Sequence, residues 1–276
     1  MRDHLDFEPI KLFSSYMRLV DVPRLEDEIS PEPQLQGKRL GLVNGSAWIQ
    51  LWSYYFGRLF LPGVKLVNIG NEASQLNFMK AHYNREECPP KNNIEVFARY
   101  ARDLVELADV DAILVTCSTM NRSLSAVKSA VSDYNIQVLQ IDEPMMEKAV
   151  QIGGKVLVIA THGPTVRSTQ QLLEEKCIKM GKSGNLQYTG ATIEQAFDLL
   201  GKGNIEEHNR LIAQTIIDRI EKENLTQVVL AQLSMSVFSF SYPEPEKVFG
   251  IPVLMSGVEG FKRIKEILMS IKKDKK

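Results

Sequence analysis

From about residue 37 onward, short apolar runs rich in β-branched residues alternate with segments in which apolar residues recur at helical spacing. The runs are RLGLVN (39–44), VKLVNI (64–69), AILVT (112–116), IQVLQI (136–141), KVLVIAT (155–161), QVVLA (227–231) and IPVLMS (251–256). Strands that alternate with helices are typical of βαβ units and parallel sheets. The pattern therefore predicts an α/β fold.

The spacing of apolar residues between and after these strands predicts helices that cover the sheets. The sets are Ile94, Phe97, Ala98, Ala101, Leu104, Val105 and Ala108; Leu124, Val127, Val131 and Tyr134; and Phe261, Ile264, Leu268 and Ile271. A KKDKK tail follows the last set, and its cations suit the carboxyl end of a terminal helix.

Residues 1–36 do not share this pattern. Prolines interrupt them at positions 9, 23, 31 and 33, and the stretch LEDEISPEP is acidic. Such a segment is typical of an irregular arm. We expect residues 1–36 to form a surface extension or a contact within a homodimer.

The sequence resembles itself at two places. The segment 37-GKRLGLVNGS-46 matches 154-GKVLVIATHG-163, and 113-ILVTCSTMN-121 matches 228-VVLAQLSMS-236, at nearly equal offsets and in the same order. This repetition predicts two similar α/β lobes that face each other across a cleft. We assign residues 37–141 and 251–276 to the first lobe and residues 142–250 to the second.

Composition narrows the range of partners. Apolar residues make up 44% of the 276 residues and the formal net charge is −1, so there is no basic excess to bind nucleic acid or anionic lipid. The N-terminus lacks the order of a signal peptide, and no stretch is apolar enough to span a membrane. We expect a cytoplasmic protein without a membrane partner.

The three cysteines lack the spacing of a metal site, and their odd, sparse number does not build a disulfide framework. Cys117 is the strongest candidate for a functional thiol, because it follows the apolar run AILVT and is followed directly by polar residues. We expect no metal and judge each cysteine by its own surroundings.

Small polar residues stand where the predicted strands end, which is where open α/β sheets bind ligands. They are Asn44, Gly45 and Ser46; Cys117, Ser118, Thr119 and Asn121; Thr161, His162 and Thr165; and Gln232 and Ser234. Hydroxyls and backbone N–H groups at helix starts can hold a carboxylate, so we expect a small carboxylic acid as ligand. Six of these residues could instead be plain helix caps: Asn44, Ser46, Ser118, Thr119, Thr161 and Thr165.

At this point the residues resemble the aspartate/glutamate racemase superfamily, over roughly residues 37–276. The resemblance rests on TCSTMN, IDEPMMEKAV, VLVIATHGPTVRST and VVLAQLSM. It implies two pseudo-symmetric Rossmann-like lobes, no metal or organic cofactor, and two cysteines on opposite faces of the substrate carbon. The chain departs from the family because the second cysteine position is Gln232, or Ser234 if the alignment shifts by one or two residues.

Cys117 stands at the predicted start of a helix, whose dipole and N–H groups are expected to lower the pKa of the thiol. It could then act as a base, acid or nucleophile, although a buried cysteine at a strand end can also be a packing residue. Gln232 has no suitable pKa for proton exchange. A single thiol fits decarboxylation or proton transfer on one face of the substrate, with opposite hydroxyls and amides stabilising an enediolate.

Two alternatives remain open at this stage. A true racemase would use His162 or Ser234 opposite Cys117, since a histidine titrates near neutral pH. A non-catalytic protein on the same fold would bind a small acid with Cys117 un-ionised. Trp48, which follows the first turn, packs on the sheet or lines a pocket for an apolar or aryl substituent.

Overall fold

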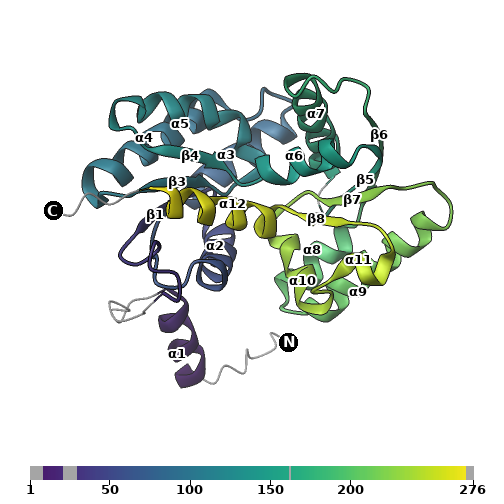
Figure 1. The fold of residues 1–276 in the computed structure, drawn as a ribbon, viewed down its shortest axis with the longest axis horizontal. Helices are drawn as coiled ribbons and strands as arrows, with labels where there is room; N and C mark the ends of the chain where they lie inside the picture. The colour runs from purple at the N-terminus through teal and green to yellow at the C-terminus, as the bar shows by residue number, and fades with distance from the viewer. Residues whose placement is uncertain (1–8, 21–29, 162, 272–276) are drawn as a thin grey trace.

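The computed structural model of the chain describes residues 9–20, 30–161 and 163–271. Within these residues the chain forms two four-stranded sheets, each covered by helices on both faces (Figure 1). Every pair of neighbouring strands in the two sheets is parallel. The predicted α/β fold with two lobes and parallel sheets is therefore confirmed.

The first sheet has the strand order β2-β1-β3-β4. Its elements are β1 (Arg39–Asn44), α2 (Ala47–Phe60), β2 (Lys65–Gly70), α3 (Glu72–Tyr83), α4 (Lys91–Ala108), β3 (Ala112–Val115), the 3₁₀ helix η2 (Ser118–Ser123), α5 (Leu124–Ala130), the 3₁₀ helix η3 (Ser132–Tyr134) and β4 (Gln137–Gln140). The helices predicted from Ile94 onward and from Leu124 onward are α4 and α5.

Side chains alternate between the two faces of this sheet, and each face has its own helices. Leu42 and Leu114 point toward α2 and share a core with Phe56, whereas Ile113 and Val115 share a core with α4. Gly41 allows α4 to come close, because a Cβ at this position would lie 2.9 Å from Cδ1 of Leu104.

The second sheet has the order β6-β5-β7-β8. Its elements are α6 (Glu143–Ile152), β5 (Gly154–Ala160), α7 (Gly163–Lys179), β6 (Leu186–Thr192), α8 (Glu194–Gly201), α9 (Ile205–Ile220), β7 (Gln227–Leu230), the 3₁₀ helix η4 (Leu233–Val237), α10 (Phe238–Ser241), α11 (Pro245–Phe249) and β8 (Val253–Met255). Helices α6 and α7 contribute to one core of this lobe, with Cys177 buried among them, and α9 contributes to the other.

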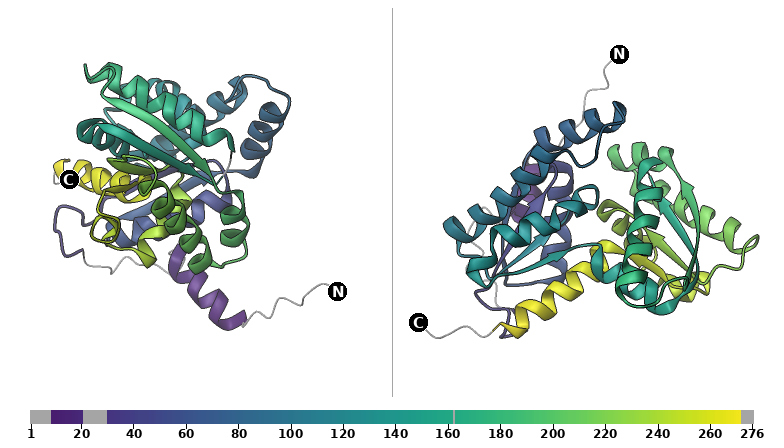
Figure 2. Two further views of the ribbon diagram at one scale, coloured as in Figure 1. Left: turned by 90° about the vertical axis from the view of Figure 1, so that its right-hand side faces the viewer. Right: turned by 90° about the horizontal axis from the view of Figure 1, so that it is seen from above.

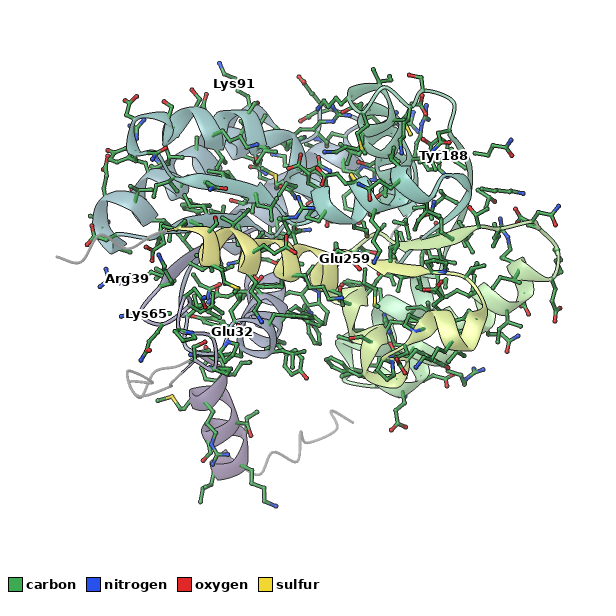
Figure 3. All side chains as sticks on the ribbon, in the orientation of Figure 1. Glu32, Arg39, Lys65, Lys91, Tyr188 and Glu259 are labelled. Atoms are coloured by element: carbon green, nitrogen blue, oxygen red, sulfur yellow. The ribbon has the colours of Figure 1, made fainter. Side chains whose placement is uncertain are left out.

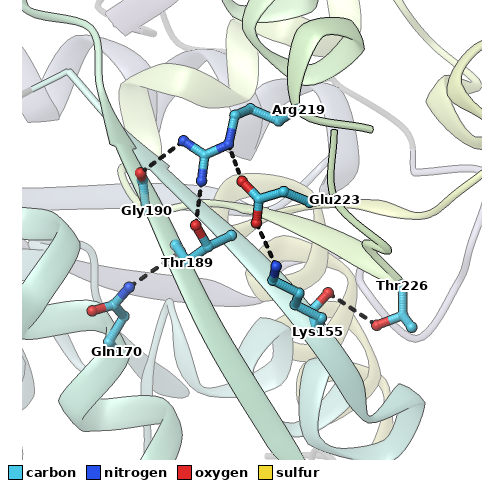
Figure 4. A network of polar contacts seen from close by, with 7 residues as sticks. All are labelled: Lys155, Gln170, Thr189, Gly190, Arg219, Glu223 and Thr226. Atoms are coloured by element: carbon cyan, nitrogen blue, oxygen red, sulfur yellow. Dashed lines mark hydrogen bonds and ion pairs between the residues drawn. The ribbon is translucent and has the colours of Figure 1, made fainter. Parts of the chain in front are cut away.

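A network of hydrogen bonds and ion pairs holds α9 onto this sheet (Figure 4). The Arg219 guanidinium donates to the Thr189 hydroxyl and the Gly190 carbonyl of β6 and pairs with Glu223. Glu223 in turn pairs with Lys155 of β5, with 2.6 Å between Nζ and Oε2. The network therefore ties two neighbouring strands to the helix that covers them.

The last helix, α12 (Ser256–Ser270), links the two lobes and runs from the second toward the first (Figure 2). Phe261 packs in a core that consists mainly of first-lobe residues and also includes Leu233 and Val237 of the second lobe. Glu259, labelled in Figure 3, pairs with Lys148 of α6 at 2.9 Å. The division of the chain differs here from the sequence-based one, which placed residues 251–276 in the first lobe. Strand β8 pairs with β7 of the second sheet, and only the helix returns.

The N-terminal region is more regular than the sequence suggested. Residues 9–20 form the helix α1 (Pro9–Val20), which contacts α2, so the expectation of an irregular arm is wrong for these residues. Proline is well tolerated at the first helical position, because its missing N–H would have no partner there. Further on, Glu32 pairs with Lys265 of α12 at 2.8 Å (Figure 3). No helix among the described residues is long and apolar enough to cross a membrane.

Candidate functional site

A cleft of about 410 Å³ lies between the lobes, and both lobes contribute to its lining. The lining residues that come from strand-end turns are Ser46, Thr116, Cys117, Ser118 and Thr119 in the first lobe and Thr165, Gln232 and Ser234 in the second. The structure thus brings together strand-end turns that lie far apart in sequence. They meet because the carboxyl ends of parallel strands share one edge of each sheet.

A larger groove of about 600 Å³ adjoins the cleft. The two share Phe78, Ser118, Thr119 and Thr165. The groove is more charged than the cleft, because its lining includes His82, Glu86, Arg122, Asp142 and Arg167. Asn121 lines this groove and not the cleft.

Cys117 follows β3 and is 3% exposed. Its Sγ lies 3.1 Å from Oγ1 of Thr119, and the first-lobe turn after β1 packs directly against it. A Cβ on Gly45 would lie 2.6 Å from this sulfur, so only glycine permits the approach. Gly45 therefore shapes the surroundings of the thiol, although it does not itself line the cleft.

The expected lowering of the Cys117 pKa is contradicted. Burial raises the pKa of Cys117, and the nearby charge of Asp142 raises it further, whereas hydrogen bonds from Thr119 and from the backbone of Met120 lower it only in part. The turn that Cys117 begins is a short 3₁₀ helix, whose dipole is small compared with the cost of burying a charge. The thiol is consequently protonated near neutral pH.

Asp142 is a buried carboxyl that sequence reasoning did not select. It is 2% exposed, and it accepts hydrogen bonds from the Ser118 hydroxyl at 2.9 Å and from Nε2 of Gln140 at 3.2 Å. The same Gln140 nitrogen donates to the Cys117 carbonyl at 3.3 Å. Burial raises the pKa of Asp142 to about 6, against the opposing effect of these hydrogen bonds.

Gln232 occupies the second-lobe position that corresponds to Cys117. Its Oε1 accepts from the Thr161 backbone N–H at 2.8 Å and from the Thr161 hydroxyl at 3.0 Å. A backbone N–H can only donate, so this contact fixes which end of the amide carries the oxygen. The NH₂ end is left as a donor on a side chain that lines the cleft.

The remaining selected residues differ in their surroundings. Asn44 is fully buried and is turned away from the cleft, because its amide bonds to Asn68, Ser53 and Thr116. We correct its assignment as a substrate ligand: it ties strand ends together. Ser46 caps α2 by accepting from the Ile49 N–H at 3.4 Å, and it lines the cleft as well.

Thr161 is engaged with Gln232 and does not line the cleft, whereas Ser234 is 3% exposed and does. His162 falls outside the described residues. No group of three or more His, Cys, Asp or Glu side chains that could hold a metal ion occurs in the described parts of the chain.

One wall of the cleft was not foreseen from strand ends. Glu72, Gln75, Met79 and Tyr83 lie on one face of α3, and Trp48 faces Phe197 of the second lobe with ring centroids 6.4 Å apart. Trp48 thus lines the pocket, as one of the two sequence interpretations proposed. The spacing of the α3 residues repeats every three to four positions and was a usable signal.

Comparison with solved structures identifies the architecture. An aspartate racemase homologue from Pyrococcus horikoshii matches with a TM-score of 0.58 and 16% identity, over 84% of this chain and 99% of that one. Glutamate racemase from Francisella tularensis, in complex with D-glutamate, matches with a TM-score of 0.57 and 15% identity, over 86% of this chain and 84% of that one. Allantoin racemase from Klebsiella pneumoniae matches with a TM-score of 0.55 and 14% identity, over 87% of this chain and 95% of that one.

This chain has the two-lobed fold of these racemases. No family model and no curated protein matches its sequence. The racemase fold therefore connects the chain to these proteins through structure, and what each of its own residues contributes follows from the geometry of the cleft.

Proposed function

We propose that the protein is a cofactor-independent, racemase-like enzyme that acts on a small carboxylic acid through the thiol of Cys117. The reaction is proton transfer at the α-carbon or decarboxylation, with a proton exchanged on one face only. The observation that carries this proposal is the pairing of Cys117 with Thr119 in a cleft whose second-lobe wall bears Gln232 in place of a second thiol.

The protonation state of Cys117 favours proton delivery. In decarboxylation, the bond from the α-carbon to one carboxyl breaks, carbon dioxide leaves, and the electron pair enters an enediolate. The S–H proton then passes to the α-carbon, and the resulting thiolate regains a proton from water. Hydroxyl and amide donors such as Thr165 and Gln232 stabilise the enediolate oxygens before the proton arrives.

In the isomerisation direction the thiolate must form first. Its pKa is raised, so the ion is scarce at neutral pH, but it is a stronger base once formed. A true racemase would also need a proton donor on the opposite face. Ser234 lines that side, so two-sided exchange is the second candidate function.

Deuterium incorporation tests the proposal. The protein is incubated in D₂O with a panel of α-substituted carboxylic and malonic acids, and the α-position is followed by NMR. Cys117→Ala is expected to lower the rate by about 10²- to 10⁴-fold, the usual contribution of a positioned acid or base. The matched control is Cys177→Ala, because Cys177 is buried in the second-lobe core away from the cleft.

The outcomes separate the candidates. Full activity in Cys117→Ala contradicts the proposal. Exchange from one enantiomer of a chiral substrate supports one-sided chemistry, whereas exchange from both supports the racemase with Ser234 or another group opposite. Binding of an acid with no exchange and no carbon dioxide release indicates the non-catalytic alternative.

A further inference from the structure

A carboxylate of the chain itself occupies the first-lobe end of the cleft. Both oxygens of Glu72, the first residue of α3, accept from the backbone N–H of Ala47, at 3.1 and 2.9 Å. Ala47 is the first residue of α2, whose unpaired N–H groups and dipole favour an anion. A substrate carboxylate at this end would compete with Glu72 for the same donor.

Charge is distributed unevenly along the cleft and the adjoining groove. Among the described residues that line the cleft, Glu72 is the only carboxylate, and no lysine, arginine or histidine is present. The cationic side chains Arg122 and Arg167 line the groove beyond Ser118 and Thr119, although Arg122 also pairs with Glu175. The lining of the groove also includes the carboxylates Glu86 and Asp142, but cationic partners for a substrate carboxylate occur only on this side and not in the cleft beside Glu72.

Apolar side chains line the cleft beside Glu72. They are Trp48, Ile49, Met79 and Phe197, which line the cleft and not the groove. Trp48 packs against Trp52 in a T-shaped arrangement, with ring centroids 5.3 Å apart, so its ring is held in place. A charged substituent placed here would contact apolar side chains and find no cationic partner in the lining of the cleft.

We propose that Glu72 is a specificity-determining residue that restricts the substrate to acids whose substituent is uncharged and apolar. The acid group lies at Ser118, Thr119 and Thr165, and the substituent lies against Trp48 and Phe197. An acid with a second, distal carboxylate is rejected by the negative charge of Glu72. D-Glutamate, the ligand of the Francisella tularensis enzyme, has such a carboxylate.

This inference rests on the proposed function only in that it places the reacting carbon at Cys117. Its test therefore measures binding and not turnover. Hexanoate and glutarate are matched in length and differ in the distal carboxylate. Their affinities are measured by calorimetry and by the fluorescence of Trp48 and Trp52, the two tryptophans of the chain.

Wild-type protein is expected to bind hexanoate at least about tenfold more tightly than glutarate, and Glu72→Gln is expected to narrow this ratio about tenfold, mainly by binding glutarate better. The effect should shrink at high salt, because Glu72 is exposed and its charge is screened. The matched control is Glu206→Gln, because Glu206 is likewise an exposed first-turn carboxylate but lies on α9 and does not line the cleft.

Equal affinities for the two acids in wild-type protein, or an unchanged ratio in Glu72→Gln, would overturn the inference. Trp48→Ala supplies a second measurement, and it should weaken hexanoate binding more than glutarate binding. The ratio is also measured in Cys117→Ala. A preserved preference in that variant supports the inference independently of whether Cys117 proves to be catalytic.

Discussion

Replacing Asp142 with asparagine should change how the stability of the protein depends on pH. The carboxyl is 2% exposed and holds Ser118 and Gln140 beside Cys117. An amide has nearly the same shape and keeps an oxygen for Ser118. Its new NH₂ group would face Nε2 of Gln140. The Gln140 amide can turn so that Oε1, which has no partner among the described residues, accepts from this group, but its bond to the Cys117 carbonyl is then lost at every pH.

The magnitude follows from the pKa of Asp142, which burial raises from its ordinary 3.8 to about 6. At 1.36 kcal/mol for each pH unit this difference is worth about 3 kcal/mol. Because the folded state holds the proton more tightly than the unfolded state, the contribution of this carboxyl is fully present below about pH 4. It is lost as the pH rises to about 6 and beyond.

The free energy of unfolding of Asp142→Asn minus that of wild-type protein should therefore rise by up to about 3 kcal/mol between pH 4 and pH 7.5. Urea unfolding followed by tryptophan fluorescence between pH 4 and 8 measures both curves, and the other carboxylates cancel in the difference. Asp198→Asn, on the exposed side of α8, is the control. Parallel curves for wild type and Asp142→Asn would refute the reasoning.

Two further substitutions test the packing around the site and between the lobes. Gly45→Ala should lower activity and destabilise by about 1–3 kcal/mol, because its Cβ would lie 2.6 Å from Sγ of Cys117. The control Gly201→Ala, whose Cβ would meet nothing within 4 Å, should be neutral or slightly stabilising in thermal melts. Phe261→Ala should cost about 3–5 kcal/mol in urea unfolding, because this α12 ring is fully buried in the first-lobe core, and a loss below 1 kcal/mol would contradict that role.

The sequence predicted seven of the eight strands in the described residues and missed β6. All seven expected runs overlap strands, including the outer strands β2, β4 and β8, because each run is rich in apolar, β-branched residues. β6, LQYTGAT, is one of the two outer strands of the second sheet, and it was not predicted because several of its side chains are polar or small. An edge strand needs fewer apolar residues, so its pattern resembles a loop.

The site was predicted to the extent that strand ends define it. Cys117, Ser118, Thr119, Thr165, Gln232 and Ser234 meet in the cleft as expected. Residues such as Glu72 and Phe197 were not selected, because they reach the cleft from helices whose orientation depends on tertiary packing. Asn44 was misassigned for the converse reason: a polar residue at a strand end can turn inward when neighbouring side chains satisfy its amide.

In both lobes a side-chain hydrogen bond joins the ends of two neighbouring strands, but different residues make this bond, and only the second lobe uses the residue that corresponds to Cys117. In the first lobe Asn44 bonds Thr116 at 2.6 Å, which ties β1 to β3 and leaves Cys117 to the cleft. In the second lobe the corresponding tie, between β5 and β7, is made by Gln232 itself through Thr161. Exchanging Gln232 for a cysteine would thus remove the acceptor for two Thr161 donors, at about 1–3 kcal/mol for each buried donor left unpaired. Gln232, at the second-lobe position that corresponds to Cys117, is thus a structural link, and this supports the proposal of chemistry on a single face.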